Sequence, residues 1–315
     1  MGHVVGQASV RIVSLAEVRA AASFDVVFGA VRDALIAHAA GATQIPPPMH
    51  LVFPDADGDC HVKAGYMAGA QHFAVKIASG FYRNSAIGLP NNNGLVLVVD
   101  ATNGVPAAIL ADEGWLTAWR TAAAGALITH ALTPPEVSDI AVMGTGLQAR
   151  LQVVWLRELR TLNSVRVWGR RADEVNRLCT ELAEDGINAS PGEIAGAECV
   201  ITATAATTPL APAEAFSSAV HVTALGTDLP GKGELPPDLF ASASIIATDD
   251  HEQCLHHGDF GNAVRAGVVS SDSDVSVGTV LRDGVRHRSG LSIADLTGIG
   301  AADAAVASAV LTALG

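Results

Sequence analysis

The sequence has little charge and few aromatic side chains. Of its 315 residues, 16% are Asp, Glu, Lys or Arg and 4% are Phe, Trp or Tyr, whereas 49% are hydrophobic. A chain so rich in apolar residues can bury a large core, which excludes an intrinsically disordered protein. Its length is sufficient for two domains of ordinary size.

Basic residues are scarcer than acidic ones, and the formal net charge is -13. An acidic surface repels phosphate backbones, so we expect no nucleic-acid partner. No basic block indicates a membrane surface, and no apolar run reaches the ~18–20 residues that span a bilayer. The first nine residues lack the charged and apolar regions of a signal peptide, so we expect a cytoplasmic protein.

Cysteines are few, and their spacing suggests neither a disulfide framework nor a zinc site. We expect free thiols in a reducing compartment. The 11 histidines form no His-x-x-x-His pattern, and the adjacent His256 and His257 cannot share one face of a helix or strand. We therefore expect no metal ion. The cysteines are Cys60, Cys179, Cys199 and Cys254.

The first third of the chain indicates an antiparallel α+β segment. A strand and then a helix are expected between about residues 10 and 38, with Gly41 ending the helix. Pro46–Pro48 forces extended backbone. Ala101–Gly104 is typical of a hairpin turn between two apolar strands. The strands expected after the prolines cover residues 50–53, 73–78, 94–100 and 105–110.

An alternation of strands and helices begins after Pro134-Pro135, which end a helical run over residues 117–132. Such alternation implies right-handed crossovers and a parallel, doubly wound sheet. The Ala-rich residues 293–314 are expected to be helical. The other expected strands cover residues 139–143, 165–168, 198–202, 219–225 and 243–248, and the helices residues 148–160 and 172–184.

A glycine-rich turn, GTGLQA at residues 144–149, fits the dinucleotide-binding pattern G-x-G-x-x-G/A directly after an apolar strand and at the start of a helix. Gly144 permits the tight turn, Gly146 lets the backbone approach a pyrophosphate, and Ala149 allows close packing. Free N–H groups at the helix start favour phosphate charge. A glycine turn without a ligand is the alternative.

The end of the second strand in this alternation decides between NAD and NADP. NAD-binding folds usually have Asp or Glu there, but here Trp168-Gly169 is followed by Arg170 and Arg171. A guanidinium binds the 2′-phosphate that a carboxylate repels, so we expect NADP rather than NAD. Asp173 comes slightly late and is expected to cap the next helix. Two arginines on a surface loop are the alternative.

Three charged residues are candidates for the chemistry. Lys76, one of three lysines, lies mid-strand among apolar residues and would need an anionic partner if it faces inward. Arg120 is the one charge in a long helical stretch and could clamp a carboxylate. Asp228 follows a strand end, where doubly wound sheets bind ligands. A solvent-facing lysine, a structural ion pair and a turn aspartate are the respective alternatives.

Together these segments resemble the ornithine cyclodeaminase/mu-crystallin family over roughly residues 44–310. The Arg120–Ala123 and Asp228–Lys232 blocks are specific, whereas the glycine turn is generic. Other matching stretches are Val75-Lys76, residues 91–104 with Pro106, residues 116–117, 144–149 and 226–235, Gly258-Asp259, and Thr297-Gly298 with Asp303.

The resemblance implies a homodimer whose chain has an α/β, doubly wound Rossmann-type domain and an α+β substrate-binding and dimerisation domain. We expect the substrate-binding domain at residues 1–116 with 293–315 and the dinucleotide-binding domain at residues 117–292.

The resemblance also implies residue roles. Lys76 and Arg120 would hold the substrate α-carboxylate, and Asp228 would handle the proton at the amino or imino nitrogen, so Asp228 and Lys76 are the expected catalytic residues. Gln148 would lie beside the pyrophosphate. The full set expected at the cofactor is Asn91, Arg120, Thr121, Gly144, Gly146, Leu147, Gln148, Arg170, Arg171, Thr204, Lys232 and Thr297.

Two departures from the family pattern bear on the reaction. The family usually has an Arg shortly after the proline that corresponds to Pro46, but this chain continues with Pro47–His50. Ornithine-cyclising members have a Glu that falls near His61. The chain thus has one fewer carboxylate ligand, which favours general redox chemistry over cyclisation.

We therefore expect an NAD(P)-dependent oxidoreductase that transfers hydride at the C–N bond of a small amino or imino acid, similar to ketimine or pyrroline-2-carboxylate reductases. An ornithine cyclodeaminase, a lyase with bound NAD, is the first alternative. A non-catalytic, NADPH-dependent binder of a small ligand is the second. Retention of Lys76, Arg120 and Asp228 favours an enzyme over a binder.

Overall fold

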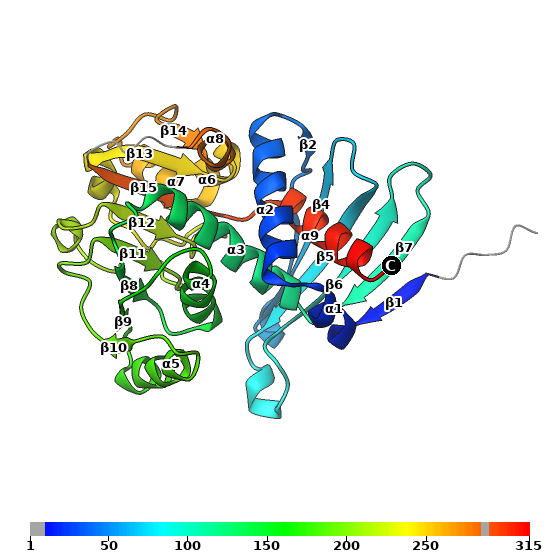
Figure 1. Cartoon of the computed structure of the whole chain (residues 1–315), viewed down its shortest axis with the longest axis horizontal. Coiled ribbons are helices and arrows are strands. Elements are labelled where there is room, and N and C mark those ends of the chain that lie inside the picture. The colour runs from blue at the N-terminus through cyan, green and yellow to red at the C-terminus, as the bar shows by residue number, and fades with distance from the viewer. Residues whose placement is uncertain (1–9, 285–289) are drawn as a thin grey trace, which may run out of the picture. The chain divides into compact units, whose positions relative to one another are not determined.

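The chain forms two compact units, and the computed structural model describes residues 10–284 and 290–315 (Figure 1). Unit 1 comprises Met1–Ala30, Ala42–Thr117 and Gly300–Gly315, and unit 2 comprises Val31–Gly41 and Ala118–Ile299. Among the described residues, no helix combines the length and the apolar character needed to cross a bilayer.

Unit 1 is built on a mixed seven-stranded sheet in the order β1-β7-β6-β5-β4-β2, with β3 paired to β4. The pairing of β1 with β7 is parallel, and the pairings from β7 to β2 and of β3 with β4 are antiparallel. The strands are β1 (Arg11–Ser14), β2 (Thr43–Gln44), β3 (Met49–Phe53), β4 (Gly58–Met67), β5 (His72–Phe81), β6 (Asn92–Asp100) and β7 (Pro106–Ala111), with short 3-10 turns η1 (Pro54–Ala56) and η2 (Asn84–Ile87).

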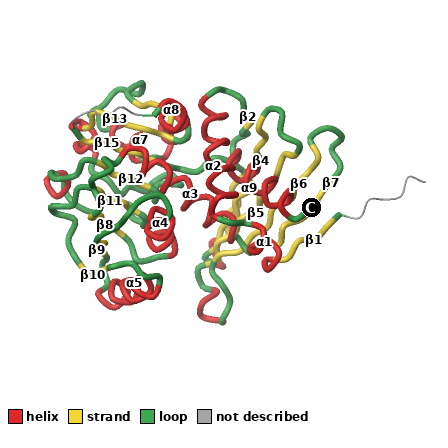
Figure 2. The backbone as a smooth tube through the Cα atoms, viewed as in Figure 1, coloured by secondary structure: helices red, strands yellow, loops and turns green. Residues whose placement is uncertain are grey.

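One face of the unit 1 sheet is covered by the C-terminal helix α9 (Gly300–Ala313), which contacts β4 and β5 (Figure 2). The approach is close enough to require glycine, because a Cβ on Gly65 would lie 2.2 Å from the Gly300 carbonyl oxygen. Helix α1 (Leu15–Ala21), which contacts α9 and β7, begins with a capping box between Ser14 and Glu17.

The strand β4 has no counterpart among the sequence predictions. Its ten residues, GDCHVKAGYM, alternate between polar and less polar side chains only over the short stretch 59–64, with a glycine at each side and few strongly apolar residues, so the strand was overlooked. It forms nonetheless because β3 and β5 pair with it on both sides.

Unit 2 contains an eight-stranded sheet in the order β10-β9-β8-β11-β12-β15-β13-β14, in which every pairing is parallel. The predicted α/β class with a doubly wound parallel sheet is confirmed. The chain leaves β8 toward β9 and then returns to β11 on its other side, which creates a topological switch point between β8 and β11. The strands are β8 (Asp139–Met143), β9 (Ser164–Trp168), β10 (Ala189–Pro191), β11 (Cys199–Thr202), β12 (His221–Ala224), β13 (Ala243–Thr248), β14 (Asp274–Ser276) and β15 (Leu291–Asp295).

The core of unit 2 lies between this sheet and its crossover segments. Trp155, Phe240 and Phe260 are among its largest fully buried side chains. The helices are α4 (Leu147–Arg157), α5 (Ala172–Glu184), α6 (His251–His257), α7 (Asp259–Arg265) and α8 (Val277–Asp283), with 3-10 turns η3 (Ala213–Phe216) and η4 (Pro237–Ser242). Two longer helices, α2 (Phe24–Ala39) and α3 (Trp115–Leu132), contribute residues to both units.

The predicted helix over residues 293–314 is wrong at its start. Leu291–Asp295 is strand β15, fully buried between β12 and β13, and the helix begins at Gly300. A short apolar strand and a buried helix segment cannot be told apart by periodicity alone. The break lies at Gly298, whose φ of +84° favours glycine.

Candidate functional site

The carboxyl ends of β9, β8, β11 and β12 in unit 2 meet in a cluster of close backbone contacts. A Cβ on Gly169 would lie 2.7 Å from the Thr145 methyl carbon, and one on Gly144 would lie 2.4 Å from the Ala203 carbonyl oxygen. A Cβ on Gly226 would lie 2.2 Å from a carbonyl oxygen. Three strand ends therefore need glycine at the edge where doubly wound sheets bind ligands.

The glycine turn has the geometry that its sequence predicts. Gly144 has a φ of +128°, and its N–H donates to the Trp168 carbonyl over 2.9 Å. Gly146 is the N-cap of α4 without a side-chain cap, and a Cβ built on it would meet nothing within 4 Å. Ala149, in the first turn of α4, is fully buried. The turn thus leaves open space in front of the free N–H groups of a helix of 11 residues.

Gln148 lies in the first turn of α4, next to the exposed Leu147. Its amide nitrogen donates to the Ala118 carbonyl oxygen over 3.0 Å. Gln152 continues this contact, because its amide donates to the Thr121 carbonyl over 3.2 Å. These bonds fix the start of α4 against α3. The predicted cofactor contacts of Leu147, Gln148 and Thr121 stay predictions.

Arg170 and Arg171 lie between β9 and α5, as predicted, beside a carboxylate that the prediction overlooked. The Arg171 guanidinium is 2.8 Å from Glu174, and Arg177 also contacts Glu174 and donates to the Thr145 carbonyl. The prediction that Asp173 caps α5 is wrong, because the helix begins at Ala172 and Arg171 is its N-cap. The loop between β9 and α5 therefore combines two arginines with the Glu174 carboxylate.

A buried glutamate, Glu234, ties two strand ends together and was missed by sequence analysis. Its oxygens accept from the Thr202 hydroxyl at 2.7 Å, the Thr204 N–H at 2.6 Å and hydroxyl at 2.7 Å, and the Gly226 N–H at 2.7 Å. Burial raises the pKa of Glu234, and these donors oppose that shift. Thr204, a predicted cofactor residue, thus has its hydroxyl directed at Glu234.

Asp228 and Lys232 form an ion pair in the loop after β12. The Lys232 ammonium lies 2.6 Å from the Asp228 carboxylate, whose side chain is 56% exposed. The base of the loop is fixed, because the neighbouring Thr227 hydroxyl donates to Asp295 over 3.1 Å. The structure therefore presents an accessible carboxylate on an anchored loop, next to one of the chain's three lysines.

Asp295 is buried at the end of β15. It also accepts the Phe260 N–H at 2.8 Å. Burial raises the pKa of Asp295 to about 7, and the nearby Asp249 and Glu234 add to this effect. Burial likewise raises the pKa of Asp259, whose carboxylate accepts from the Glu234 N–H.

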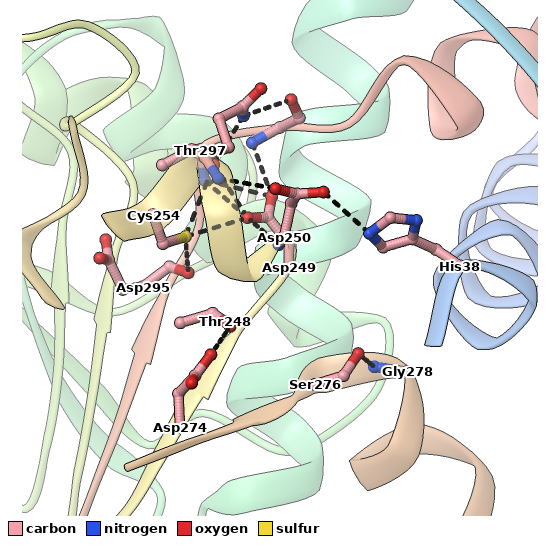
Figure 3. A network of polar contacts seen from close by, with 12 residues as sticks. His38, Thr248, Asp249, Asp250, Cys254, Asp274, Ser276, Gly278, Asp295 and Thr297 are labelled. Carbon is pink, nitrogen blue, oxygen red and sulfur yellow. Dashed lines mark hydrogen bonds and ion pairs between the residues drawn. The ribbon is translucent and has the colours of Figure 1, made fainter. Parts of the chain in front are cut away.

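Asp249 organises the Thr297-Gly298 loop (Figure 3). It accepts from the Thr297 N–H and hydroxyl, each over 3.0 Å, and from the Gly298 N–H over 2.6 Å. Arg120 lies against this loop, since a Cβ on Gly298 would be 2.7 Å from its guanidinium. Arg120 is 7% exposed. Unit 2 therefore places Arg120 beside Gly298, the residue after Thr297, and the ligand roles of Arg120 and Thr297 stay predictions.

Asp250, the next residue, caps α6 through the Gln253 N–H. It also pairs with His38 at 3.0 Å, and this contact lowers the pKa of Asp250 (Figure 3). The Gln253 amide in turn donates to the Thr297 hydroxyl over 2.7 Å. The loop with Thr297 is thus held from both sides.

Lys76 lies in unit 1 and faces inward, with only 4% of its surface exposed. Its ammonium is 2.8 Å from the Asp303 carboxylate on α9, and its cross-strand neighbours are Lys63 on β4 and Val96 on β6. The buried Asp112 also interacts with the charge of Lys76. The anionic partner that a buried lysine needs is therefore present within unit 1.

Asn91, a predicted cofactor residue, also belongs to unit 1. Its side-chain oxygen accepts the Ser85 N–H over 2.9 Å, and its backbone carbonyl accepts the Phe81 N–H. These bonds close the loop around η2. A contact of Asn91 with the cofactor stays a prediction.

Comparison with known sequences extends across nearly the whole chain. The ornithine cyclodeaminase/mu-crystallin family pattern matches residues 9–314. An uncharacterized cyclodeaminase of Sinorhizobium fredii is 35% identical over 277 residues, which is 85% of this chain and 84% of the relative. A putative dehydrogenase of Rhizobium meliloti is 35% identical over 312 residues, which is 95% of this chain and 94% of the relative.

Two solved structures with the same architecture contain bound NAD. An archaeal alanine dehydrogenase dimer with bound NAD matches with a TM-score of 0.87 at 27% identity, over 96% of this chain and 95% of the other. The iminosuccinate reductase of Paracoccus denitrificans in complex with NAD+ matches with a TM-score of 0.88 at 27% identity, over 96% of both chains. On these grounds the chain belongs to the ornithine cyclodeaminase/mu-crystallin family.

Proposed function

We propose that the protein is an NAD(P)-dependent oxidoreductase that acts at the C–N bond of a small amino or imino acid. The observation that carries this proposal is the cluster of strand ends in unit 2. There a glycine turn with open space in front of it lies at the switch point, beside an accessible carboxylate after β12. The carboxyl edge at a switch point is where doubly wound sheets bind dinucleotides.

The residues of this edge fit a dinucleotide. The N–H groups at the start of α4 would bind the pyrophosphate, and Gly146 offers no side chain to block its approach. Gln148, Thr204 and Lys232 would line the cofactor, together with the remaining expected set. A bound nicotinamide supplies or accepts the hydride at the substrate carbon.

Three side chains would serve the substrate. The guanidinium of Arg120 and the ammonium of Lys76 would bind its α-carboxylate and orient it, since fixed orientation lowers the barrier. Asp228 would give a proton to the imine nitrogen during reduction, or take one from the amine during oxidation. The ion pair with Lys232 holds the Asp228 carboxylate in place between turnovers.

NADP is the cofactor that we favour. Arg170 and Arg171 follow β9 directly, and a pair of guanidinium groups suits a 2′-phosphate. We expect the double variant Arg170→Ala/Arg171→Ala to lose about tenfold in NADPH affinity while NADH affinity stays within about twofold. Arg282→Ala is the control. Equal losses for both cofactors would overturn this preference.

The reaction class is tested with cyclic imines, α-imino acids, alanine and ornithine, each with both cofactors. Nicotinamide absorbance and ammonia release are followed together. A reductase oxidises the reduced cofactor in proportion to imine consumed, whereas a cyclodeaminase releases ammonia from ornithine without net absorbance change. No turnover of any compound, with intact NADPH binding, would overturn the enzyme proposal in favour of a binding protein.

A homodimer would bury the uncovered face of the unit 1 sheet. Strand register places Met49, Leu51 and Ile77 on the face opposite Lys76, and they are 63%, 54% and 40% exposed. An exposed apolar sheet face of this kind is typical of an interface. We expect Leu51→Glu to be a monomer, as measured by size-exclusion chromatography with light-scattering detection of the molar mass. The control Val275→Glu, at an exposed position in unit 2, should stay dimeric; monomeric wild type would overturn the proposal.

A further inference from the structure

Strands β3 and β4 bring three potential metal ligands together on one face of the unit 1 sheet. His50 pairs directly with His61 across the two strands, and Asp59 lies two residues before His61 on the same strand. Side chains two residues apart share a face, so all three point to the same side. This arrangement joins residues that are unremarkable in linear spacing, which is why the sequence predicts no metal.

The three side chains converge at short range. The His50 Nε2 and His61 Nε2 atoms lie 3.8 Å and 3.6 Å from the same carboxylate oxygen of Asp59, and the three potential ligand atoms all lie within 4.8 Å of one another. Both distances exceed a hydrogen bond. In the described part of the chain, this is the one set of three such ligands that meets.

Two imidazoles and a carboxylate suit a zinc-type ion. Metal–ligand bonds of about 2.0–2.1 Å in a tetrahedral site separate the ligand atoms by roughly 3.4 Å, so the two histidine–aspartate distances need to shorten by only a few tenths of an ångström. The rings stack with their planes at 12°, so one must turn about its Cβ–Cγ bond to aim at a shared ion. His50 is 38% exposed, and such torsions are soft.

We propose that His50, Asp59 and His61 form a site for a divalent transition-metal ion of the Zn²⁺ class. Three protein ligands leave at least one coordination position for water or another small ligand. The site lies on the same sheet face as Lys63 and Lys76, because His61 is two residues from Lys63 on β4. The inference rests on the strand register and on the convergence of the three side chains, and it does not depend on the proposed reaction.

The test titrates tag-free, chelator-treated protein with ZnCl₂ by calorimetry and by competition with a chromogenic chelator. We expect about one ion per chain, and at least about a tenfold loss of affinity in His50→Ala, Asp59→Asn and His61→Ala. Co²⁺ should give the visible absorption of a low-coordinate site in the wild type and lose it in each variant.

The control is His256→Ala/His257→Ala, which removes the adjacent histidine pair on α6 without touching the unit 1 sheet. This variant should bind Zn²⁺ as the wild type does, and circular dichroism verifies that all variants are folded. Wild-type affinity in the three site variants, or equal loss in the control, would show adventitious binding and overturn the proposal.

Discussion

At the scale of single residues, Asp228 and Lys232 show how an exposed carboxylate can be kept in position. The two charges are four residues apart and 2.6 Å distant, and the loop that carries them is anchored from below by Thr227 on Asp295. The pair is partly exposed, so it contributes little to stability. The ion pair instead fixes the orientation of the Asp228 carboxylate.

Asp228→Asn should lower kcat by about 100-fold or more, because an amide cannot exchange a proton with the substrate nitrogen. Cofactor affinity, measured by fluorescence titration with NADPH, should stay within about twofold. Asp238→Asn, at an exposed position in η4, is the matched control. An equal fall in NADPH affinity would assign Asp228 to binding instead.

Glu234→Gln should lower the free energy of unfolding by about 1–3 kcal/mol, because the new amide NH₂ faces N–H and O–H donors that the carboxylate accepts. Urea unfolding followed by circular dichroism measures this loss. The exposed Glu214→Gln provides the comparison. Unchanged stability in Glu234→Gln would mean that Glu234 is protonated in the folded state.

The sequence indicated a special role for a residue where its type is rare in the chain, and gave no such indication where its type is common. A buried orientation of Lys76 could be suspected because it is one of three lysines within an apolar strand. Glu234 could not, because a glutamate between Gly233 and Leu235 resembles any surface loop residue. Its role comes from four donors on three residues at two strand ends, which only the fold brings together.

At the scale of elements, the turn between β8 and α4 contains two glycines that are there for different reasons. Gly144 is required by the backbone itself, since its φ is +128° and a Cβ would overlap a carbonyl. Gly146 has an ordinary φ of -86° and no neighbour within 4 Å of a Cβ. Only a bound ligand would make Gly146 necessary.

Gly144→Ala and Gly146→Ala should therefore affect different properties of the protein, the first its stability and the second its cofactor binding. The first should destabilise the protein by about 1–3 kcal/mol through backbone strain. The second should leave the melting temperature nearly unchanged but weaken NADPH binding, because its methyl group occupies the approach of the pyrophosphate. Thermal melts and fluorescence titrations of both variants provide the measurement. Undiminished NADPH binding by Gly146→Ala would contradict the placement of the cofactor.

Helices and strands could be predicted where the hydrophobic periodicity agreed with the residues that typically begin or end an element. Helix α5 covers Ala172–Glu184 as predicted, because a strong apolar stripe starts after the arginines and ends before Gly186. Strand β4 was missed because its alternation is short and its apolar side chains are small, and β15 was missed because a short buried apolar strand has no period that distinguishes it from a helix. Both strands are stabilised by the neighbouring strands that pair with them.

At the scale of the whole molecule, the buried carboxylates make stability depend on pH. Asp295 has a pKa of about 7 in the fold, far above that of an unfolded aspartate. A raised carboxyl pKa favours folding at low pH, and this contribution is lost as the pH rises from about 4 through about 7. Above that range Asp295 is a buried charge that burial disfavours.

Asp295→Asn should remove that part of the pH dependence. An asparagine resembles the protonated acid, so the variant should lose less stability than the wild type when urea unfolding is compared at pH 5 and pH 8. The bond from the Phe260 N–H can be kept by the amide oxygen. A parallel pH dependence in both proteins would contradict the raised pKa of Asp295.

The order in which the chain visits its two units has a consequence for biosynthesis. It crosses between them four times, after Ala30, Gly41, Thr117 and Ile299. Strand β15, which lies between β12 and β13, is synthesised after every other strand of the unit 2 sheet, and α9, which covers the sheet of unit 1, follows it. Neither hydrophobic core can close before these two elements exist, so a nascent chain stalled before Leu291 leaves apolar surface of both units exposed to aggregation.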